Sequence, residues 1–176
     1  RDPLGIKPLC LGMKNNSYVL ASESCAIDAI GGTFIRDVAP GELIVIDQHG
    51  LRSYPREEKP KRERICIFEY IYFARPDSIM DGQSIYKARR LAGRILARTY
   101  PVEADVVIAV PDSGTDAAIG YSEASGIPFG IGLIKNRYIG RTFIQPVQVQ
   151  REEAVRIKLN VLKSAVEGKR VVLVDD

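Results

Sequence analysis

The sequence predicts an α/β protein in two parts, on three observations. Residues 1–54 contain short apolar runs separated by turn residues, and no helix there is long enough to connect parallel strands. Residues 65–176 alternate apolar strands with helices, which predicts right-handed crossovers and a parallel sheet with helices on both faces. Between them, residues 55–64 are almost all charged or Pro, so they predict a linker.

Antiparallel strands are expected in the first part. Apolar runs at residues 9–13 and 18–21 flank a cluster of turn-forming residues at 14–17, which predicts a hairpin. Residues 43–47 form another apolar run and predict a further strand. None of these runs shows helical spacing, so pairing between sequence neighbours is favoured.

Capping residues mark two helices. Residues 22–30 predict a short helix with Ser22 or Ser24 as its N-cap. Ser84 caps a longer helix that ends near Thr99. Its apolar residues recur at helical spacing along one stripe: Ile85, Ala88, Leu91, Ala92, Ile95 and Leu96.

The remaining elements alternate regularly. Residues 105–110 are a β-branched run of the kind found in fully buried strands, and residues 116–125 predict the helix that follows. Residues 131–134 predict a third strand, and residues 151–167 a helix with apolar positions at helical spacing. Residues 171–174 predict the next buried strand.

Composition excludes several classes of protein. With 45% hydrophobic and 27% charged residues among 176, the chain can bury a core and is not a disordered tail. Its net charge of +3 does not indicate nucleic acid binding. No apolar run approaches the roughly 18 residues that span a bilayer. The cysteines Cys10, Cys25 and Cys66 form no Cys-x-x-Cys pair, so neither disulfides nor a zinc site is expected, and a cytoplasmic location fits best.

The ends of the chain suggest an internal fragment of a longer polypeptide. The chain begins at Arg1 without an initiator Met. It closes with a strand at residues 171–174 and the carboxylates of Asp175 and Asp176, where a loop and a helix would be expected to follow. Some functional residues are therefore expected to lie outside these 176 residues.

Polar residues follow three of the predicted strands, where parallel sheets bind their ligands. The first set is the turn at residues 111–116, which combines Ser, Gly and Thr at the start of a helix. Free backbone N–H groups and the helix dipole at such a turn suit an anion such as pyrophosphate. The alternative is an ordinary strand-to-helix turn with Asp112 or Ser113 as N-cap.

The second set is a long loop at residues 135–150. From Lys135 through Arg151 it contains four basic residues and no acidic one, which suits a lid over a phosphate-rich substrate. The alternative is a nucleic-acid contact in which Tyr138 and Phe143 stack on bases.

The third set is the pair of adjacent carboxylates at Asp175 and Asp176. Their mutual repulsion calls for a cation, and Mg²⁺ with a polyphosphorylated sugar fits because Mg²⁺ is held by one or two carboxylates plus substrate oxygens. The alternative is an exposed acidic turn without a ligand.

At this point the sequence resembles the glutamine phosphoribosylpyrophosphate amidotransferases over essentially its whole length. The most specific blocks are residues 68–78 (FEYIYFARPDS) and 135–144 (KNRYIGRTFI). The turn at 111–114 and the closing strand with its two Asp residues occur in the same order as in that family, and the closing strand is shared by phosphoribosyltransferases in general.

The resemblance implies a fold and an activity. Residues 1–54 would end a β-rich N-terminal-nucleophile glutaminase domain, and 65–176 would form an incomplete type I phosphoribosyltransferase domain. The glutaminase frees ammonia from glutamine, and the transferase uses it to displace pyrophosphate from phosphoribosyl pyrophosphate, giving 5-phosphoribosylamine. This is the first step of de novo purine biosynthesis.

The resemblance also implies roles for individual residues. Substrate-binding residues are Asp112, Ser113, Gly114, Thr115, Asp175 and Asp176. Catalytic residues of the closing loop are Lys135, Tyr138 and Arg141. The Mg²⁺ ligands are Ser113, Asp175 and Asp176, and the walls of the ammonia passage are Tyr72 and Ile144.

Further implications concern cofactors and partners. Some family members carry a [4Fe–4S] cluster, and Cys66 stands where its first ligand falls, although such a cluster needs four thiolates. A homo-oligomer, dimer or tetramer, and feedback by purine nucleotides are expected. The family's catalytic N-terminal Cys is absent, since Arg1 stands first, so the fragment alone is expected to be inactive. The alternatives are another phosphoribosyltransferase or a non-catalytic regulator that binds phosphoribosyl pyrophosphate.

Overall fold

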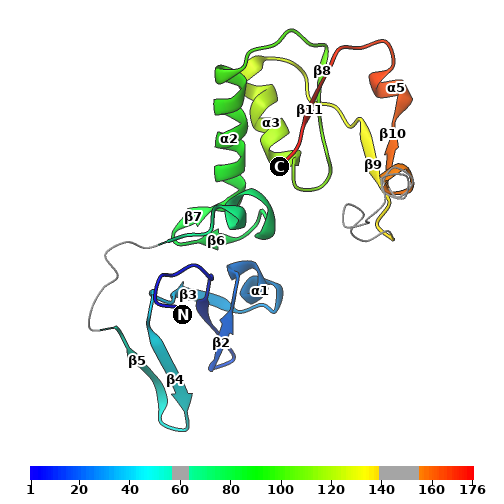
Figure 1. Ribbon diagram of the computed structural model, residues 1–176. Coiled ribbons are helices and arrows are strands. Elements are labelled where there is room, and N and C mark those ends of the chain that lie inside the picture. Colours follow the sequence, from blue (N-terminus) through cyan, green and yellow to red (C-terminus); the bar gives the residue numbers. More distant parts are fainter. Residues whose placement is uncertain (57–63, 139–154) are drawn as a thin grey trace, which may run out of the picture. The chain divides into compact units, whose positions relative to one another are not determined.

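A computed structural model describes residues 1–56, 64–138 and 155–176 (Figure 1). The chain forms two compact units, Arg1–Ala88 and Arg89–Asp176, which are described separately. Most of the predicted linker at 55–64 and most of the predicted loop at 135–150 lie outside the described residues.

A three-stranded antiparallel sheet organises the first unit. Its order is β2-β1-β3, with β1 at Cys10–Lys14, β2 at Ser17–Ala21 and β3 at Thr33–Asp37. Asn15 and Asn16 both have positive φ, 46° and 62°, as the tight turn between β1 and β2 requires. The predicted hairpin and the antiparallel pairing are thus confirmed.

Helix α1 (Ser24–Ala29) places Ile27 in the core of this unit. A Cβ atom on Gly12 would come within 2.7 Å of the Ile27 side chain, so only glycine lets β1 approach the helix there. The N-cap is Glu23, and the prediction of Ser22 or Ser24 is wrong. The Ser24 hydroxyl instead accepts a hydrogen bond from the Ile79 amide at 2.8 Å, a tertiary contact that no local pattern reveals.

The segment around residues 69–84 belongs to the first unit. It contains the π-helix η1 (Glu69–Phe73) and the short paired strands β6 (Ile79–Met80) and β7 (Gln83–Ser84). The buried Arg1 guanidinium donates to both carboxylate oxygens of Asp81, at 2.8 and 3.0 Å. It also donates to the carbonyls of Gly5, Lys7 and Val38. One arginine therefore joins the first loop of the chain to the β6–β7 turn.

A hairpin of β4 (Leu43–Asp47) and β5 (Gly50–Tyr54) completes the first unit, and the strand predicted at 43–47 is confirmed. Glu42, just before β4, is buried although it carries a carboxylate. Arg36 donates to both its oxygens at 2.6 and 2.8 Å, and the Ser53 hydroxyl and the Ala39 amide also donate to it. The pKa of Glu42 is about 2, below its ordinary value of 4.5, and the hydrogen bonds from Arg36 are the largest cause.

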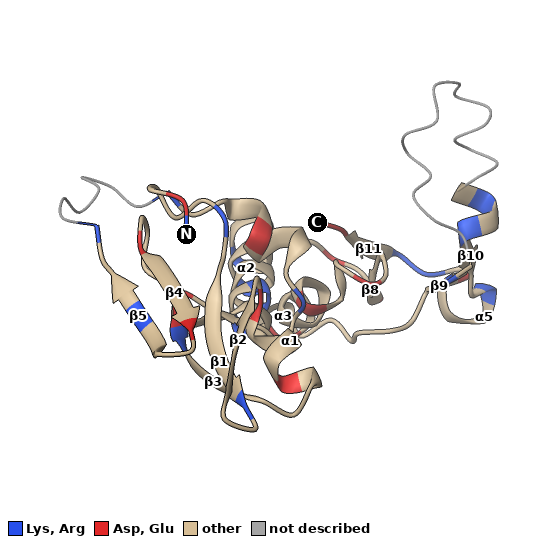
Figure 2. Ribbon diagram, turned by 90° about the horizontal axis from the view of Figure 1, so that it is seen from below, with Lys and Arg blue, Asp and Glu red and all other residues tan. Residues whose placement is uncertain are grey.

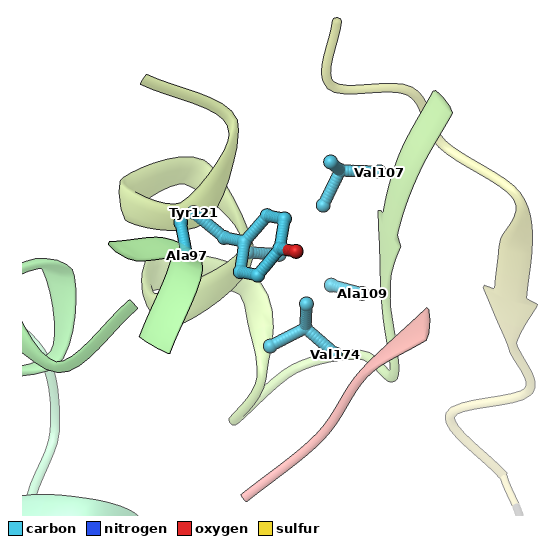
Figure 3. Close-up of a cluster of buried hydrophobic side chains, with 6 residues drawn as sticks. Ala97, Val107, Ala109, Tyr121 and Val174 are labelled. Carbon is cyan, nitrogen blue, oxygen red and sulfur yellow. The ribbon is translucent and has the colours of Figure 1, made fainter. Parts of the chain in front are cut away.

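The core of the second unit lies between two helices and two parallel strands. Strands β8 (Val106–Ala109) and β11 (Val171–Val174) pair in parallel, and a further parallel bridge joins Val107 to Phe129. Figure 3 shows the side chains that fill this core, namely Ala97 from α2 (Ile85–Thr99), Tyr121 from α3 (Thr115–Ser125), and Val107, Ala109 and Val174 from the strands. The helices predicted at 84–99 and 116–125 are confirmed, and so is the parallel pairing. The Ser84 hydroxyl caps α2 by accepting a hydrogen bond from the Lys87 amide.

Two glycines let α2 and α3 approach closely. A Cβ atom on Gly93 would lie 1.9 Å from the Ala117 carbonyl oxygen, and one on Gly120 would lie 2.1 Å from that of Arg90. Charged residues flank this contact, because Arg90 and Arg94 of α2 both form ion pairs with Glu123 of α3. The helices are thus in backbone contact at their crossing.

Two sequence predictions are wrong in the last part of the chain. Strand β9 (Leu133–Lys135) does not join β8 and β11 but pairs antiparallel with β10 (Leu159–Val161). Residues 151–154 of the helix predicted at 151–167 lie outside the described residues. The remainder is not one helix, because β10 separates the helical residues 155–158 from a short helix α5 (Lys163–Val166). Leu159 fits both the predicted helical spacing and, with Val161, strand alternation. The β9 backbone supplies the hydrogen-bond partners that favour the strand.

We expect Glu42→Gln to lower the free energy of unfolding by about 2–3 kcal/mol at pH 7, since it leaves Arg36 without its buried partner. Because the folded-state pKa of Glu42 is depressed, its stabilisation is complete above pH 4.5 and is lost as pH falls through 2. The stability difference from wild type, measured by urea unfolding, should therefore shrink between about pH 5 and pH 2. The control is Asp77→Asn, which breaks an exposed pair with Arg75 and should change stability by about 0.5 kcal/mol or less. A difference independent of pH would contradict the assignment.

We expect Gly93→Ala to lower the free energy of unfolding of the second unit by about 2 kcal/mol, because the new methyl group meets backbone atoms of α3 that cannot rotate away. Ala92→Gly is the matched control one residue earlier, where an exposed methyl group is removed and only about 1 kcal/mol of helix propensity is lost. Thermal unfolding followed by circular dichroism measures both. A Gly93→Ala protein as stable as wild type would show that the helices are not in close contact.

Candidate functional site

The loop after β8 folds back on the strand before α3 begins. The Gly114 amide donates to the Val110 carbonyl at 3.2 Å, and the Thr115 amide donates to the Asp112 carbonyl at 3.3 Å. The N-cap of α3 is the buried Gly114, so the alternative in which Asp112 or Ser113 caps this helix is not observed. Helix N-termini leave their first amide groups without intrahelical partners, so the first turn of α3 presents donors suited to an anion.

The parallel pairing of β8 and β11 brings the ends of both strands to one edge. The Val110 amide donates to the Val174 carbonyl at 2.9 Å, which continues the ladder past β8. A Cβ atom on Gly114 would lie 2.7 Å from the Val174 carbonyl oxygen and 3.2 Å from the Asp175 Cα atom. The backbone of the anion loop (residues 112–115) is thus in contact with the start of the acidic pair, as the sequence predicts for strand ends in a parallel sheet.

The carboxylates at this edge favour a cation. The pKa of Asp175 is raised, first by burial and then by its hydrogen bond with the Asp176 side chain. No group of three or more His, Cys, Asp or Glu side chains is placed to hold a metal ion in the part of the chain that the structure describes. Two adjacent carboxylates nevertheless suit Mg²⁺, which takes one or two protein carboxylates and completes its shell with water and substrate oxygens. Asp175 and Asp176 therefore fit Mg²⁺ bound together with a phosphorylated substrate.

Lys135, predicted as catalytic, lies beside the anion loop. It is the last residue of β9, and its Nζ atom is 2.8 Å from Oδ2 of Asp112. Lys and Arg residues lie at the end of β9, in the helical residues 155–158 just before β10 and at the start of α5 (Figure 2). Tyr138 is 98% exposed, with its amide bonded to the Asn136 side chain. Arg141 and Ile144 lie outside the described residues.

The other predicted residues lie in the first unit. Tyr72 is half-exposed in η1, and its ring packs edge-on against Phe73 with centroids 5.7 Å apart. Cys66 is half-buried, just before η1. The buried Cys10 has its pKa raised to about 11, and the pKa of Cys25 is also raised by burial, so neither is poised to become a thiolate. These three cysteines do not fit a [4Fe–4S] cluster, which needs four thiolates.

Sequence reasoning missed two features of the second unit. One is the ion pair between Lys135 and Asp112, which are 23 residues apart. The other is the buried Arg89 of α2, whose charge lowers the pKa of Asp116 in the first turn of α3 although burial raises it overall. The only sequence signal for Arg89 is a charged position within a mainly apolar helical stripe.

A hollow of about 390 Å³ lies away from this edge. Its lining includes Val102, Glu103 and Arg170, which precede β8 and β11, so it is at the opposite end of the strands. Arg170 pairs there with Asp105 at 3.0 Å. None of the predicted site residues lines it. Among the described residues, no helix combines the length and the apolar character needed to cross a membrane.

We expect Gly114→Ala to weaken binding at the strand ends. The added methyl group would meet two backbone carbonyl oxygens, at 2.7 and 3.0 Å, and would push the anion loop away from Asp175. Stability should fall by about 1–2 kcal/mol, and affinity for inorganic pyrophosphate with Mg²⁺, measured by calorimetry, should fall more than stability alone explains. The control Ala124→Ser, at an exposed position of α3, should leave both within error. Unchanged pyrophosphate affinity in Gly114→Ala would contradict the site.

Comparison with known proteins confirms the resemblance. The chain is 62% identical over all 176 residues to the amidophosphoribosyltransferase of Archaeoglobus fulgidus, and 54% identical over 175 residues to that of Bacillus subtilis. It spans 38% and 37% of the lengths of these relatives. No protein-family model matches the chain.

Two solved structures have the same fold. The structure of an allosteric regulatory enzyme of purine biosynthesis matches 99% of the chain with a TM-score of 0.85 and 54% identity, over 37% of its own length. The B. subtilis glutamine phosphoribosylpyrophosphate amidotransferase, complexed with ADP and GMP, matches 98% with a TM-score of 0.84 and 53% identity, over 38% of its own length. In sequence and in fold, this chain is therefore similar throughout to amidophosphoribosyltransferases and corresponds to rather more than a third of their length.

Proposed function

We propose that the chain is part of a glutamine-dependent amidophosphoribosyltransferase. The reaction would convert phosphoribosyl pyrophosphate, glutamine and water to 5-phosphoribosylamine, glutamate and pyrophosphate. The observation that carries the proposal is the contact of the anion loop, at Gly114, with the strand end that bears Asp175, in a chain 62% identical to such an enzyme. Amide donors at the N-terminus of α3, beside two carboxylates, suit a magnesium-bound pyrophosphate group.

In the transferase step, ammonia attacks the anomeric carbon of the ribose and the bond from that carbon to pyrophosphate breaks. The bonding electron pair leaves with pyrophosphate, so negative charge grows on its oxygens. Amides of the first turn of α3 would donate to these oxygens, and Lys135 would add positive charge. Asp175 and Asp176, with the Ser113 hydroxyl, would hold Mg²⁺, which when bound supplies further positive charge to the pyrophosphate.

Glutamine hydrolysis falls to residues outside this chain in this proposal. Cys10 and Cys25 are buried with raised pKa values, which is the reverse of what an activated thiol nucleophile shows. Residues 1–54 would contribute the end of the glutaminase domain, residues 55–64 the linker, and residues 65–176 the transferase domain. Tyr72 and Ile144 would line the passage for ammonia, and Tyr138 and Arg141 would close over the substrate.

Cofactors, regulators and location follow as proposals of the same kind. Cys66 would bind a [4Fe–4S] cluster only together with thiolates from outside this chain. Purine nucleotides are proposed as feedback regulators because the B. subtilis relative was solved with ADP and GMP. A homo-oligomer, either dimer or tetramer, is proposed from the family resemblance. A cytoplasmic location is supported by the three free cysteines.

The test is pyrophosphate release by the full-length protein in which this sequence occurs, given phosphoribosyl pyrophosphate, Mg²⁺ and either glutamine or ammonia. Release with both donors is expected, and Asp176→Asn should reduce kcat/KM about 100-fold or more. Asp105→Asn is the matched control, because Asp105 lies at the opposite end of β8 in an exposed pair with Arg170. Its kcat/KM should stay within about two-fold of the wild-type value. If neither donor supports release, the amidotransferase assignment is wrong and a non-catalytic regulator that binds phosphoribosyl pyrophosphate becomes the better interpretation.

A further inference from the structure

The ion pair between Lys135 and Asp112 joins two parts of the proposed substrate site. Its atoms, Nζ of Lys135 and Oδ2 of Asp112, are 2.8 Å apart. The Asp112 side chain is 73% exposed and that of Lys135 is 30% exposed. The lysine is therefore the more enclosed member, and the carboxylate is the member that can turn into solvent.

Both backbones are held in place independently of this pair. Lys135 pairs with Leu159 in the β9–β10 ladder, and the next amide, that of Asn136, donates to the Lys158 carbonyl at 2.7 Å. Asp112 accepts from the Thr115 amide through its own carbonyl. Separating the charges thus requires side-chain rotation and no movement of either backbone segment.

The pair is not explained by stability. Exposed ion pairs contribute little, because solvent screens the attraction and two long side chains lose rotational freedom. A carboxylate in a loop that binds an anion also repels that anion. Asp112 therefore lowers pyrophosphate affinity unless its charge is already neutralised. The residue that neutralises it is Lys135, the same cation that the proposed substrate needs.

We propose that Asp112 is an internal competitor of the substrate, which holds Lys135 until the pyrophosphate group displaces it. This inference rests on the proposed function and adds a regulatory role for Asp112 at that site. Pyrophosphate carries more negative charge than one carboxylate, so it replaces Asp112 at Lys135 once bound, and Asp112 turns into solvent. Because of this exchange, substrate affinity depends on the charge of Asp112 even though its carboxylate does not contact the bound substrate.

A double-mutant cycle on the full-length protein tests this exchange. The Kd of inorganic pyrophosphate with Mg²⁺ is measured by calorimetry, and the KM of phosphoribosyl pyrophosphate by pyrophosphate release. Asp112→Asn should lower both constants about two- to five-fold, which is the range of an exposed ion pair. Asp112→Glu keeps the carboxylate and should shift them less, and Asp105→Asn should not shift them.

The decisive comparison is the same substitution without the lysine. Asp112→Asn is therefore introduced both into wild type and into Lys135→Met, and the factor by which it lowers the Kd is compared. If Asp112 competes for Lys135, this factor should be at least two-fold smaller in the Lys135→Met background. An equal improvement in both backgrounds would mean general charge repulsion and would overturn the proposal. A higher KM or Kd in Asp112→Asn would also overturn it, since Asp112 would then support binding. If the full-length protein binds pyrophosphate but never releases it from phosphoribosyl pyrophosphate, the proposed function fails while the cycle in Kd still decides the competition.

Discussion

The parallel ladder between β8 and β11 is the constraint on which the rest of the candidate site depends. It aligns Val106 to Ala109 with Val171 to Val174, so the two strands end at the same edge. The anion loop and the acidic pair are 60 or more residues apart in sequence, yet they meet because each directly follows one of these strands. The buried side chains of α2 and α3 cover one face of the pair and fix it in place. Hydrophobic packing and backbone hydrogen bonds therefore determine the geometry of the candidate site.

Local signals in the sequence were enough to place most of the individual helices and strands. The β1–β2 hairpin follows from Asn15 and Asn16, and α2 follows from Ser84 and helical spacing. Leu91, Ile95 and Leu96 of the predicted apolar stripe are nevertheless exposed, and Gly93 and Ala97 are buried instead. Strands β8 and β11 follow from runs of β-branched residues. The location of Asp112, Gly114 and Asp175 at one edge could likewise be predicted, because it follows from parallel topology alone.

The features that could not be predicted depend on distant partners. Leu159 to Val161 become a strand because β9 offers a ladder, and helical spacing alone favoured a helix. Glu23 rather than a serine caps α1, and its carboxylate instead binds the Arg75 amide and the Ser78 hydroxyl, each at 2.8 Å. No local sequence pattern predicts which charged residues are buried, because the free-energy cost of burying a charge depends on partners that the fold supplies. For the same reason the pairing of Lys135 with Asp112 appears only in three dimensions.

The close crossing of α2 and α3 has a consequence for how this site can change. Gly93 and Gly120 leave no room for a side chain, so these two positions set the spacing of the helices to within one methyl group. Helix α3 begins at the anion loop, and a shift of its axis is transmitted to Gly114 and the strand end beneath it. Substitutions at this crossing would thus move the anion loop through the backbone of α3. A search for variants with altered affinity should include this crossing as well as the residues that line the site.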